Sequence, residues 1–200
     1  MIRFENVCKS FDSHTVLSDL SLTVLQGEHV AIMGESGCGK TTLLRIIAGL
    51  EKVDSGVVTG YSTSDVAVVF QESRLFDSFS VLDNVACVMN LPMKEARERA
   101  RVLLQSVGLS DAVSLYPSEL SGGMAQRVSI ARAMAVDLPI LLLDEPFSAL
   151  DEGTRKKMTG LLLDFCQNKT LVLVTHSRKD AEALTDRTVF LSAVNESRKD

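Results

Sequence analysis

The chain has 200 residues, a length typical of one domain whose core is large enough to need no disulfide or structural metal. Its 46% hydrophobic and 24% charged residues exclude a disordered or fibrous protein. Its 21 Lys and Arg face 26 Asp and Glu, and the net charge of −5 disfavours nucleic acid or an anionic lipid surface as a partner. The apolar runs fall far short of the roughly 20 residues of a membrane helix, so we expect a soluble protein with no membrane span and no secretory signal.

Four cysteines are spread along the chain, at Cys8, Cys38, Cys87 and Cys166. They form no Cys-x-x-Cys pair and have no cluster of histidines beside them. We therefore expect reduced thiols, a cytosolic location and no cysteine-based metal site. Cys38 has no catalytic partner in the sequence and is interpreted as a spacer rather than a nucleophile.

In chain order, the first third of the sequence predicts strands and one helix. Branched or alternating apolar residues recur over 2–7, 20–24 and 29–33, and turn residues separate these runs. A helix is predicted over 40–48. Residues 66–70 then form a continuous apolar run, which is typical of a strand buried on both faces of a sheet.

The middle third is predicted to be helical. Apolar residues recur on one face of 80–107, and charged residues occupy the other face, which we interpret as a solvated surface. A further helix is predicted over 122–136. The α/β alternation then resumes, with strands over 140–143, 171–174 and 188–191 and helices over 151–166 and 178–184. The sequence therefore predicts an α/β core interrupted by an α-helical insertion.

A glycine-rich segment lies between the predicted strand 29–33 and the helix 40–48. Residues 34–41 read Gly-Glu-Ser-Gly-Cys-Gly-Lys-Thr and match the pattern Gly-x-x-x-x-Gly-Lys-Thr. Glycines let such a loop wind tightly, so that backbone N–H groups face a phosphate at the positive end of the helix. Lys40 supplies a mobile charge for the β- and γ-phosphates, and the Thr41 hydroxyl can bind magnesium. The pattern predicts a nucleoside triphosphate site, with a chance glycine-rich turn as the disfavoured alternative.

Two acidic residues, Asp144 and Glu145, directly follow the predicted strand 140–143. Open α/β sheets bind ligands at the carboxyl ends of their strands. Asp144 is expected to hold magnesium through its water shell, and Glu145 is expected to orient and deprotonate the attacking water. Alone, such a pair is more often a solvated turn, but the phosphate loop upstream favours the catalytic interpretation.

Residues 120–127 read Leu-Ser-Gly-Gly-Met-Ala-Gln-Arg. This octet resembles the signature motif of ATP-binding-cassette (ABC) ATPases, a more specific pattern than the phosphate loop. The simpler interpretation is a helix start with Ser121 as its N-cap. The signature motif and the helix start both imply an anion site, because the first N–H groups of a helix are free to bind an anion. The resemblance implies the ABC ATPase fold, an α/β P-loop NTPase core with a mixed or parallel sheet, an N-terminal antiparallel β portion and an α-helical subdomain insertion.

The resemblance runs from residue 2 to about residue 191 and implies roles for further positions. Phe11 resembles the aromatic residue that stacks on adenine, Gln71 the glutamine that senses magnesium and the attacking water, and His176 the switch histidine that contacts the γ-phosphate. Residues 148–151 resemble the loop that crosses a dimer interface. The complete implied set is Glu145, His176 and Gln71 for catalysis, Thr41, Gln71 and Asp144 for Mg²⁺, and Phe11, Gly34, Glu35, Ser36, Gly37, Cys38, Gly39, Lys40, Thr41, Thr42, Ser121, Gly122, Gly123 and Asp151 for ATP.

The family resemblance also implies an organisation. In ABC ATPases the signature motif of one subunit faces the γ-phosphate held by the phosphate loop of a second, so a head-to-tail homodimer encloses two ATP molecules. The resemblance implies a single domain over 1–200, in which 1–71 and about 137–200 form the nucleotide-binding core and about 72–136 the helical signature subdomain.

The kind of ABC ATPase follows from what accompanies the motifs. We expect a stand-alone subunit, because the sequence has one phosphate loop, no fused membrane segment and no room for a long coiled coil. The stretch after His176 is short, so we expect no added regulatory domain. Residues 69–76 and 80–85 resemble nitrate, sulfonate and taurine importers most closely, and 180–184 also favours bacterial importers. We predict the ATPase subunit of such an importer, peripheral on the inner face of the cell membrane, with permease subunits and a solute-binding protein as partners.

Two alternatives belong to other classes. One is a soluble ABC ATPase that acts on a protein complex such as an iron–sulfur assembly scaffold. The other is a small-molecule kinase, which is disfavoured because the signature motif would then have no role. A permease should dock between the core and the insertion, in a groove lined by Leu75, Phe76 and Phe79, whose segment lacks helical or strand periodicity. An equally weighted interpretation makes these three residues a hydrophobic pin that holds the insertion to the core.

Overall fold

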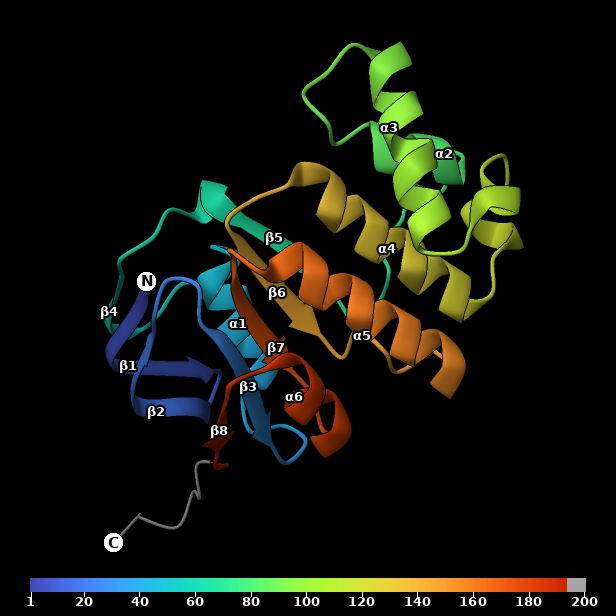
Figure 1. The fold of residues 1–200 in the computed structure, drawn as a ribbon. Helices are drawn as coiled ribbons and strands as arrows, with labels where there is room; N and C mark the ends of the chain where they lie inside the picture. The colour runs from blue at the N-terminus through green and yellow to red at the C-terminus, as the bar shows by residue number, and fades with distance from the viewer. Residues whose placement is uncertain (194–200) are drawn as a thin grey trace, which may run out of the picture.

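Five parallel strands form the central sheet of the computed structural model, which describes residues 1–193 (Figure 1). The strands are β3 (His29–Gly34), β5 (Val66–Val69), β6 (Ile140–Asp144), β7 (Thr170–Val174) and β8 (Arg187–Leu191). They lie in the order β5-β6-β7-β3-β8, and every neighbouring pair is parallel. All residues of β6 and β7 are buried, which is why both strands read as continuous apolar runs. The carboxyl ends of β3, β6 and β7 therefore meet at one edge of the sheet.

A separate antiparallel sheet contains the N-terminal part of the chain. Its strands, in the order β2-β1-β4, are β1 (Ile2–Phe11), β2 (His14–Val24) and β4 (Ser55–Thr59). The predicted strand 20–24 is thus the end of a longer strand, because the hairpin pairs His14 with Phe11. No strand was predicted at β4, which has only one half-buried residue, Val58, and is ordered by pairing with β1. The N-terminal antiparallel portion of the predicted fold is confirmed.

Helices cover both faces of the parallel sheet. They are α1 (Lys40–Ile47), α4 (Gly122–Val136), α5 (Glu152–Cys166) and α6 (Arg178–Leu184). Side chains alternate along β6, so Ile140 and Leu142 pack with α1 and the antiparallel sheet, whereas Leu141 and Leu143 pack with α4 and α5. Figure 1 shows α4 and α5 side by side over one face. The sheet therefore separates two apolar cores.

The helical insertion lies between β5 and β6 and extends away from the antiparallel sheet, as the green segment of Figure 1 shows. It contains α2 (Val81–Ala86), α3 (Met93–Ser106) and the beginning of α4, with single 3₁₀ turns at Ser110–Ala112 and Pro117–Glu119. The prediction of continuous helix over 80–107 is wrong between 87 and 92. Pro92 forms the N-cap of α3, where its fixed φ and missing N–H are tolerated but would break a helix interior.

The predicted α/β core with a helical insertion is confirmed. The core was predicted to extend to residue 200, and its last seven residues lie outside the described range. Within residues 1–193, no helix is long and apolar enough to cross a bilayer.

Candidate nucleotide-binding site

The loop between β3 and α1 lies at the carboxyl edge of the parallel sheet. Gly39 is the N-cap of α1 with a φ of 100°, a conformation that favours glycine. A Cβ at Gly39 would lie 2.8 Å from the Leu17 side chain and 2.9 Å from Val16, so the loop also packs tightly against β2. No side chain caps the first turn of α1, whose N–H groups and positive dipole end face the loop.

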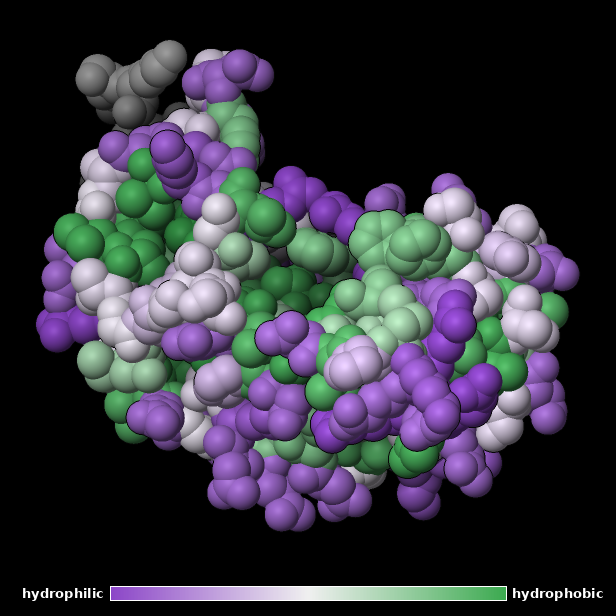
Figure 2. Space-filling view, turned by 90° about the horizontal axis from the view of Figure 1, so that it is seen from above, coloured by the Kyte–Doolittle hydropathy of each residue, from purple (hydrophilic) through white to green (hydrophobic). Residues whose placement is uncertain are grey.

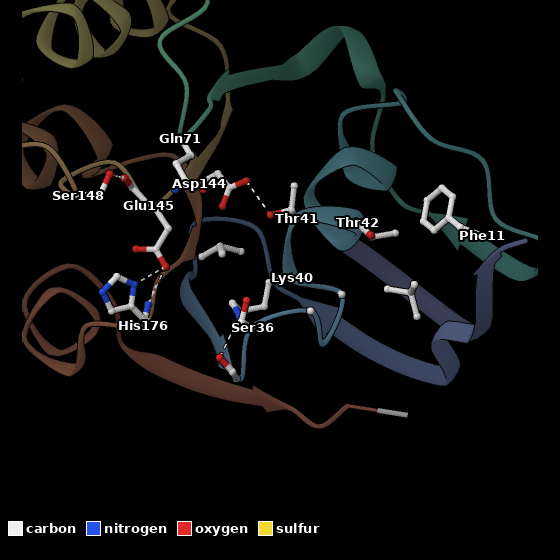
Figure 3. Close-up of a pocket in the computed structure, with 15 residues that line it drawn as sticks. Phe11, Ser36, Lys40, Thr41, Thr42, Gln71, Asp144, Glu145, Ser148 and His176 are labelled. Carbon is white, nitrogen blue, oxygen red and sulfur yellow. Dashed lines mark hydrogen bonds and ion pairs between the residues drawn. The ribbon is translucent and has the colours of Figure 1, made fainter. Parts of the chain in front are cut away.

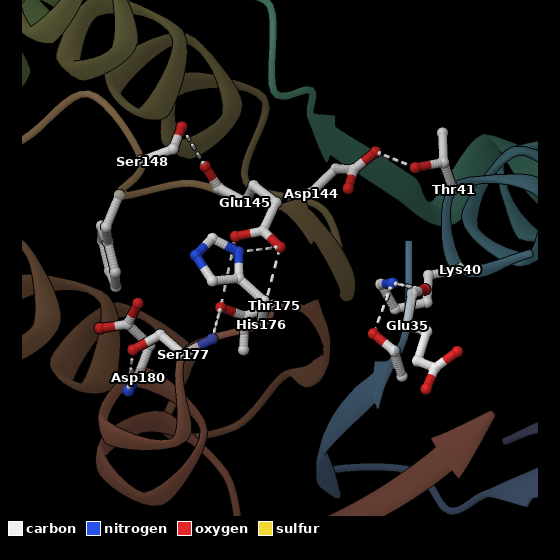
Figure 4. A network of polar contacts seen from close by, with 12 residues as sticks. Glu35, Lys40, Thr41, Asp144, Glu145, Ser148, Thr175, His176, Ser177 and Asp180 are labelled. Carbon is white, nitrogen blue, oxygen red and sulfur yellow. Dashed lines mark hydrogen bonds and ion pairs between the residues drawn. The ribbon is translucent and has the colours of Figure 1, made fainter. Parts of the chain in front are cut away.

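The Lys40 side chain folds back over this loop. Its ammonium donates hydrogen bonds to the carbonyl oxygens of Gly34, at 2.9 Å, and Glu35, at 2.7 Å (Figure 4). The Glu35 contact is with the backbone only. The ammonium is thus held beside the turn by two neutral acceptors, and a phosphate in the loop would offer it a stronger, charged acceptor.

Thr41 and Asp144 connect the phosphate loop to the end of β6. The Thr41 hydroxyl donates to Oδ2 of Asp144 at 3.0 Å. Asp144 is 4% exposed, and this burial raises the pKa of its carboxyl. The Thr41 hydrogen bond lowers that pKa, and the charge of Glu145 raises it. A buried carboxylate beside a hydroxyl would be stabilised in its charged form by a cation.

Glu145 is held in one orientation by the end of β7 (Figure 4). Its Oε1 accepts a hydrogen bond from the His176 backbone N–H at 2.9 Å and lies 2.8 Å from Nδ1 of the same residue. Its Oε2 accepts a longer hydrogen bond, 3.4 Å, from the Thr175 hydroxyl. The Glu145 backbone has a φ of 45°, a strained conformation for this residue, and its N–H donates to the Val174 carbonyl. The carboxylate is therefore positioned by the segment that follows β7 and not by its own chain segment alone.

These elements enclose a cavity of about 490 Å³. Of the predicted site residues, it is lined by Phe11, Gly34, Ser36, Gly37, Gly39, Lys40, Thr41, Thr42, Gln71, Asp144, Glu145 and His176. Phe11 lies at the end remote from Glu145, beyond Thr42, in Figure 3. Glu35 and Cys38 do not line the cavity, and Cys38 is buried behind the loop with its Sγ 3.8 Å from the Lys40 ammonium. Sequence reasoning missed Val16 and Val174, which are ordinary strand residues brought to the cavity by pairing.

The remaining predicted residues, Ser121, Gly122, Gly123 and Asp151, line a second cavity of about 390 Å³. The Ser121 hydroxyl accepts a hydrogen bond from the Met124 N–H at 3.2 Å, so Ser121 is an N-cap as well as a predicted ligand. A Cβ at Gly123 would lie 2.8 Å from the Ala149 carbonyl oxygen, which explains the need for glycine. The structure thus separates the predicted ligand set of one chain into two sites.

Asp151 begins α5 as its N-cap and accepts a hydrogen bond from the Thr154 N–H at 2.9 Å. Hydrogen bonds from Thr154 lower the pKa of the Asp151 carboxyl. The residue is therefore charged near neutral pH and lies beside the signature segment of its own chain.

Helix α4 connects the second cavity to the chain around Gln71. The buried Gln126 side chain donates to the Phe70 carbonyl at 3.2 Å, and Arg132 donates to the Ser73 carbonyl at 3.0 Å. Sequence reasoning missed both residues. The available signal was Gln126, which is a polar residue at a buried position of a mostly apolar helix face.

The fold and the site together define a class of protein. A phosphate loop joins β3 to α1, an acidic pair ends the neighbouring strand β6, and a helical insertion ends in a glycine-rich helix start. These features are those of a P-loop nucleotide-binding protein with an inserted signature helix.

The sequence pattern of the ABC transporter family matches residues 17–148, and the chain belongs to this family. The chain is 44% identical to the aliphatic sulfonates import ATP-binding protein SsuB of Cupriavidus pinatubonensis, over 95% of this chain and 65% of that protein. It is 42% identical to the sulfate/thiosulfate import ATP-binding protein CysA of Pseudomonas syringae pv. tomato, over 96% of this chain and 64% of that protein. The chain thus spans slightly less than two thirds of the length of these relatives.

A solved structure of similar fold is the dimeric post-hydrolysis state of an ATP-binding cassette bound to ADP and Pi, with a TM-score of 0.90, 32% identity and 96% coverage of both chains. The predicted ABC ATPase fold and the resemblance to the sulfonate importer group are confirmed. The roles of individual site residues stay predictions.

Proposed function

We propose that this protein is the ATP-hydrolysing subunit of a bacterial ABC importer and powers a separate membrane permease. The observation that carries the proposal is the single cavity in which Lys40, Thr41, Asp144, Glu145 and His176 meet, at the edge of the sheet where phosphate-loop proteins bind nucleotides. The two relatives are named as import ATP-binding proteins, and the similar solved structure holds ADP and Pi.

In the proposed reaction, this chain's residues bind, orient and accept a proton. The phosphate-loop N–H groups and the Lys40 ammonium stabilise negative charge that develops on the γ-phosphate and the leaving group. Glu145 accepts the proton of the attacking water, because its carboxylate borders the cavity and is held by the His176 N–H. His176 is mostly exposed at the cavity mouth, so it can contact a γ-phosphate without first breaking a packed core.

The residues around Asp144 fit Mg²⁺, which supplies charge neutralisation on the phosphates when bound. Mg²⁺ prefers hard oxygen ligands and is usually bound by one or two carboxylates together with substrate phosphates. The Thr41 hydroxyl, the Asp144 carboxylate and the Gln71 side chain border the same cavity and offer such oxygens. Within residues 1–193, no cluster of three or more His, Cys, Asp or Glu could hold a metal alone, so the phosphates would complete the site.

A homodimer would bring the two cavities together. Ser121, Gly122 and Gly123 line a different cavity from the one that Lys40 and Glu145 share, so we expect the two halves of the predicted site to come from two chains. A second chain in head-to-tail arrangement can supply the second half, and the similar solved cassette structures are dimeric. Hydrolysis would then remove the γ-phosphate that bridges the subunits and allow the dimer to open.

The permease would bind at an apolar groove of about 740 Å³ between the helical insertion and the core. Figure 2 looks down on this region, where apolar side chains gather in a hollow. The groove is lined by residues of the α2–α3 connection, of α3, of the end of α4 and by Phe165 of α5. Val102 on α3 is 66% exposed there. In this proposal, the chain is peripheral to the inner face of the membrane, and a solute-binding protein delivers the solute to the permease.

The predicted docking residues Leu75, Phe76 and Phe79 do not line this groove, and their role in permease docking stays a prediction. The buried side-chain amide of Asn84 hydrogen-bonds to the backbone of Phe76, Phe79 and Ser80, and so folds the segment back on itself. Leu75 packs against the core, as the pin interpretation requires, whereas Phe76 and Phe79 stay partly exposed with their ring centroids 5.5 Å apart.

The experiment that tests the proposal is hydrolysis of ATP by the purified chain and its Lys40→Ala variant. We expect wild-type turnover that the variant loses, because no other cation lines the cavity within residues 1–193 except His176 when protonated. Lys94→Ala, which changes an exposed lysine outside the cavity, is the matched control and should keep wild-type turnover. Equal turnover of the wild type and Lys40→Ala would contradict the proposed site. The iron–sulfur assembly alternative would be supported instead if the chain co-purified with a soluble scaffold and with no membrane protein.

A further inference from the structure

Lys9 lies beside the predicted adenine end of the cavity but does not line it. Its ammonium is 5.0 Å from the centroid of the Phe11 ring, a distance at which a cation is attracted to the ring face. Phe11 itself lines the cavity and is 41% exposed. Because the ammonium covers one face of the ring from outside the cavity, the other face is the one that a base can reach.

Two carboxylates hold Lys9 in this position. Its ammonium lies 2.9 Å from Oε1 of Glu51 and 3.1 Å from Oδ1 of Asp54, and the Lys9 side chain is only 10% exposed. Asp54 also accepts a hydrogen bond from the Ser10 N–H, and its own N–H donates to the Cys8 carbonyl. These contacts fix the backbone of β1 immediately before Phe11.

The same carboxylates belong to the segment that follows the phosphate-loop helix. Helix α1 starts at Lys40 and ends at Ile47, and Glu51 and Asp54 lie between it and β4. The ion cluster of Lys9, Glu51 and Asp54 therefore ties the far end of α1 to the strand that carries Phe11. The phosphate end and the base end of the cavity are thereby held at a fixed separation.

The charges of the ion cluster are mutually stabilised. The Glu51 and Asp54 contacts raise the pKa of Lys9, and the Lys9 contact lowers the pKa of Glu51. The pKa of Asp54 is lowered first by the Ser10 N–H and then by Lys9. All three groups are charged over the ordinary pH range, so the ion cluster is permanent rather than a pH switch.

We propose that Lys9, held by Glu51 and Asp54, is a positioning residue that presents the Phe11 ring to the nucleotide base. This inference rests on the proposed nucleotide function and adds a determinant of base binding to it. It predicts that Lys9 affects the binding of nucleotides with a base and not the binding of the phosphate chain alone, because Lys9 lies outside the cavity and acts through the ring.

The test compares Lys9→Met with wild type for ATP hydrolysis and for inhibition by inorganic tripolyphosphate, which has no base. We expect the KM for ATP to rise about fivefold, while kcat stays within about twofold, because the variant loses the cation that orients the ring. The inhibition constant of tripolyphosphate should not change. Lys9→Arg should restore the KM, because a guanidinium can keep both the carboxylate and ring contacts. Lys52→Met, which changes an exposed neighbouring lysine, is the matched control.

A Phe11→Ala background separates positioning from general damage. If Lys9 acts through the ring, Lys9→Met should add little to the KM effect of Phe11→Ala, whereas independent effects would add. An unchanged KM in Lys9→Met, an additive double variant, or equal weakening of ATP and tripolyphosphate would each overturn the inference. Failure of the wild type itself to bind ATP would overturn the proposed function, and the inference with it.

Discussion

The Glu145→Gln substitution separates a catalytic role of this residue from a structural one. It replaces one carboxylate oxygen by an amide nitrogen and preserves the shape of the side chain. The amide oxygen can still accept the 2.9 Å hydrogen bond from the His176 N–H and can keep the 2.8 Å contact with His176 Nδ1, and the hydrogen bond that Oε2 accepts from Thr175 is already long at 3.4 Å. The amide cannot accept a proton from water, so the change removes the proposed base and little else.

The expected magnitudes differ enough to decide the matter. Loss of a general base typically slows turnover about 10²- to 10⁴-fold, or about 3–5 kcal/mol in the barrier. The structural cost is one weakened hydrogen bond, about 1 kcal/mol, which in a domain of this size shifts the melting temperature by about 2–4 °C. A large loss of turnover with a small shift in melting temperature therefore identifies the catalytic role.

Single-turnover ATP hydrolysis and size-exclusion chromatography with ATP and Mg²⁺ measure both consequences. With hydrolysis stopped, the γ-phosphate bridge should persist, and Glu145→Gln should elute as a dimer that Lys40→Ala does not form. Glu182→Gln, at an exposed position of α6, is the control and should behave as wild type. Turnover within about threefold of wild type would refute the assignment of the base. Strictly monomeric elution in saturating ATP would refute the composite site.

Three further predictions test other parts of the molecule. Ser121→Arg should abolish the ATP-dependent dimer while equilibrium ATP binding persists, and Ser121→Thr, which keeps the helix cap, should retain the dimer. Loss of ATP binding in Ser121→Arg would contradict the assignment of two separate half-sites. Gln126→Leu removes the side-chain donor to the Phe70 carbonyl and should lower the free energy of unfolding by about 1–3 kcal/mol, measured by denaturant unfolding. An unchanged unfolding midpoint would show that this hydrogen bond does not stabilise the fold. Val102→Asp should abolish co-purification with the permease and leave the melting temperature unchanged, and continued co-purification would exclude the groove.

The parts of the fold that the sequence predicted are those with a strong local signal. Strands β6 and β7 are buried on both faces, so their apolar runs are unbroken, and α4 was predicted with the bounds Gly122–Val136 that the structure has. The break between α2 and α3 was available from Pro92, but the apolar period on both sides of it favoured one long helix. Strand β4 had only a short local signal in Val57, Val58 and Thr59, and its order depends on pairing with β1 about fifty residues earlier in the chain.

In the candidate site, too, the residues with a strong local signal were predicted and those that depend on distant contacts were not. Motif residues such as Lys40 and Asp144 were found because their chemistry requires fixed types at fixed spacing, and parallel strands bring them to one edge. Lys9, Gln126 and Arg132 were missed because each is held by a contact with a segment more than forty residues away. A single sequence shows such a residue only as a polar side chain in an apolar setting, and many of those merely satisfy a backbone group.

The long-range hydrogen bonds of α4 bear on how the two cavities are coupled. Helix α4 begins at the signature residues of the second cavity, and its Gln126 and Arg132 hydrogen-bond to the carbonyls of Phe70 and Ser73, on either side of Gln71. Gln126 is buried, so its hydrogen bond cannot be exchanged for one to water without opening the core. A displacement of α4 towards a nucleotide on a partner chain must therefore either break these bonds or move the backbone around Gln71, which lines the cavity that holds Glu145. We expect the second outcome, because the carbonyls lie in a connection after β5 that bends more easily than a packed helix.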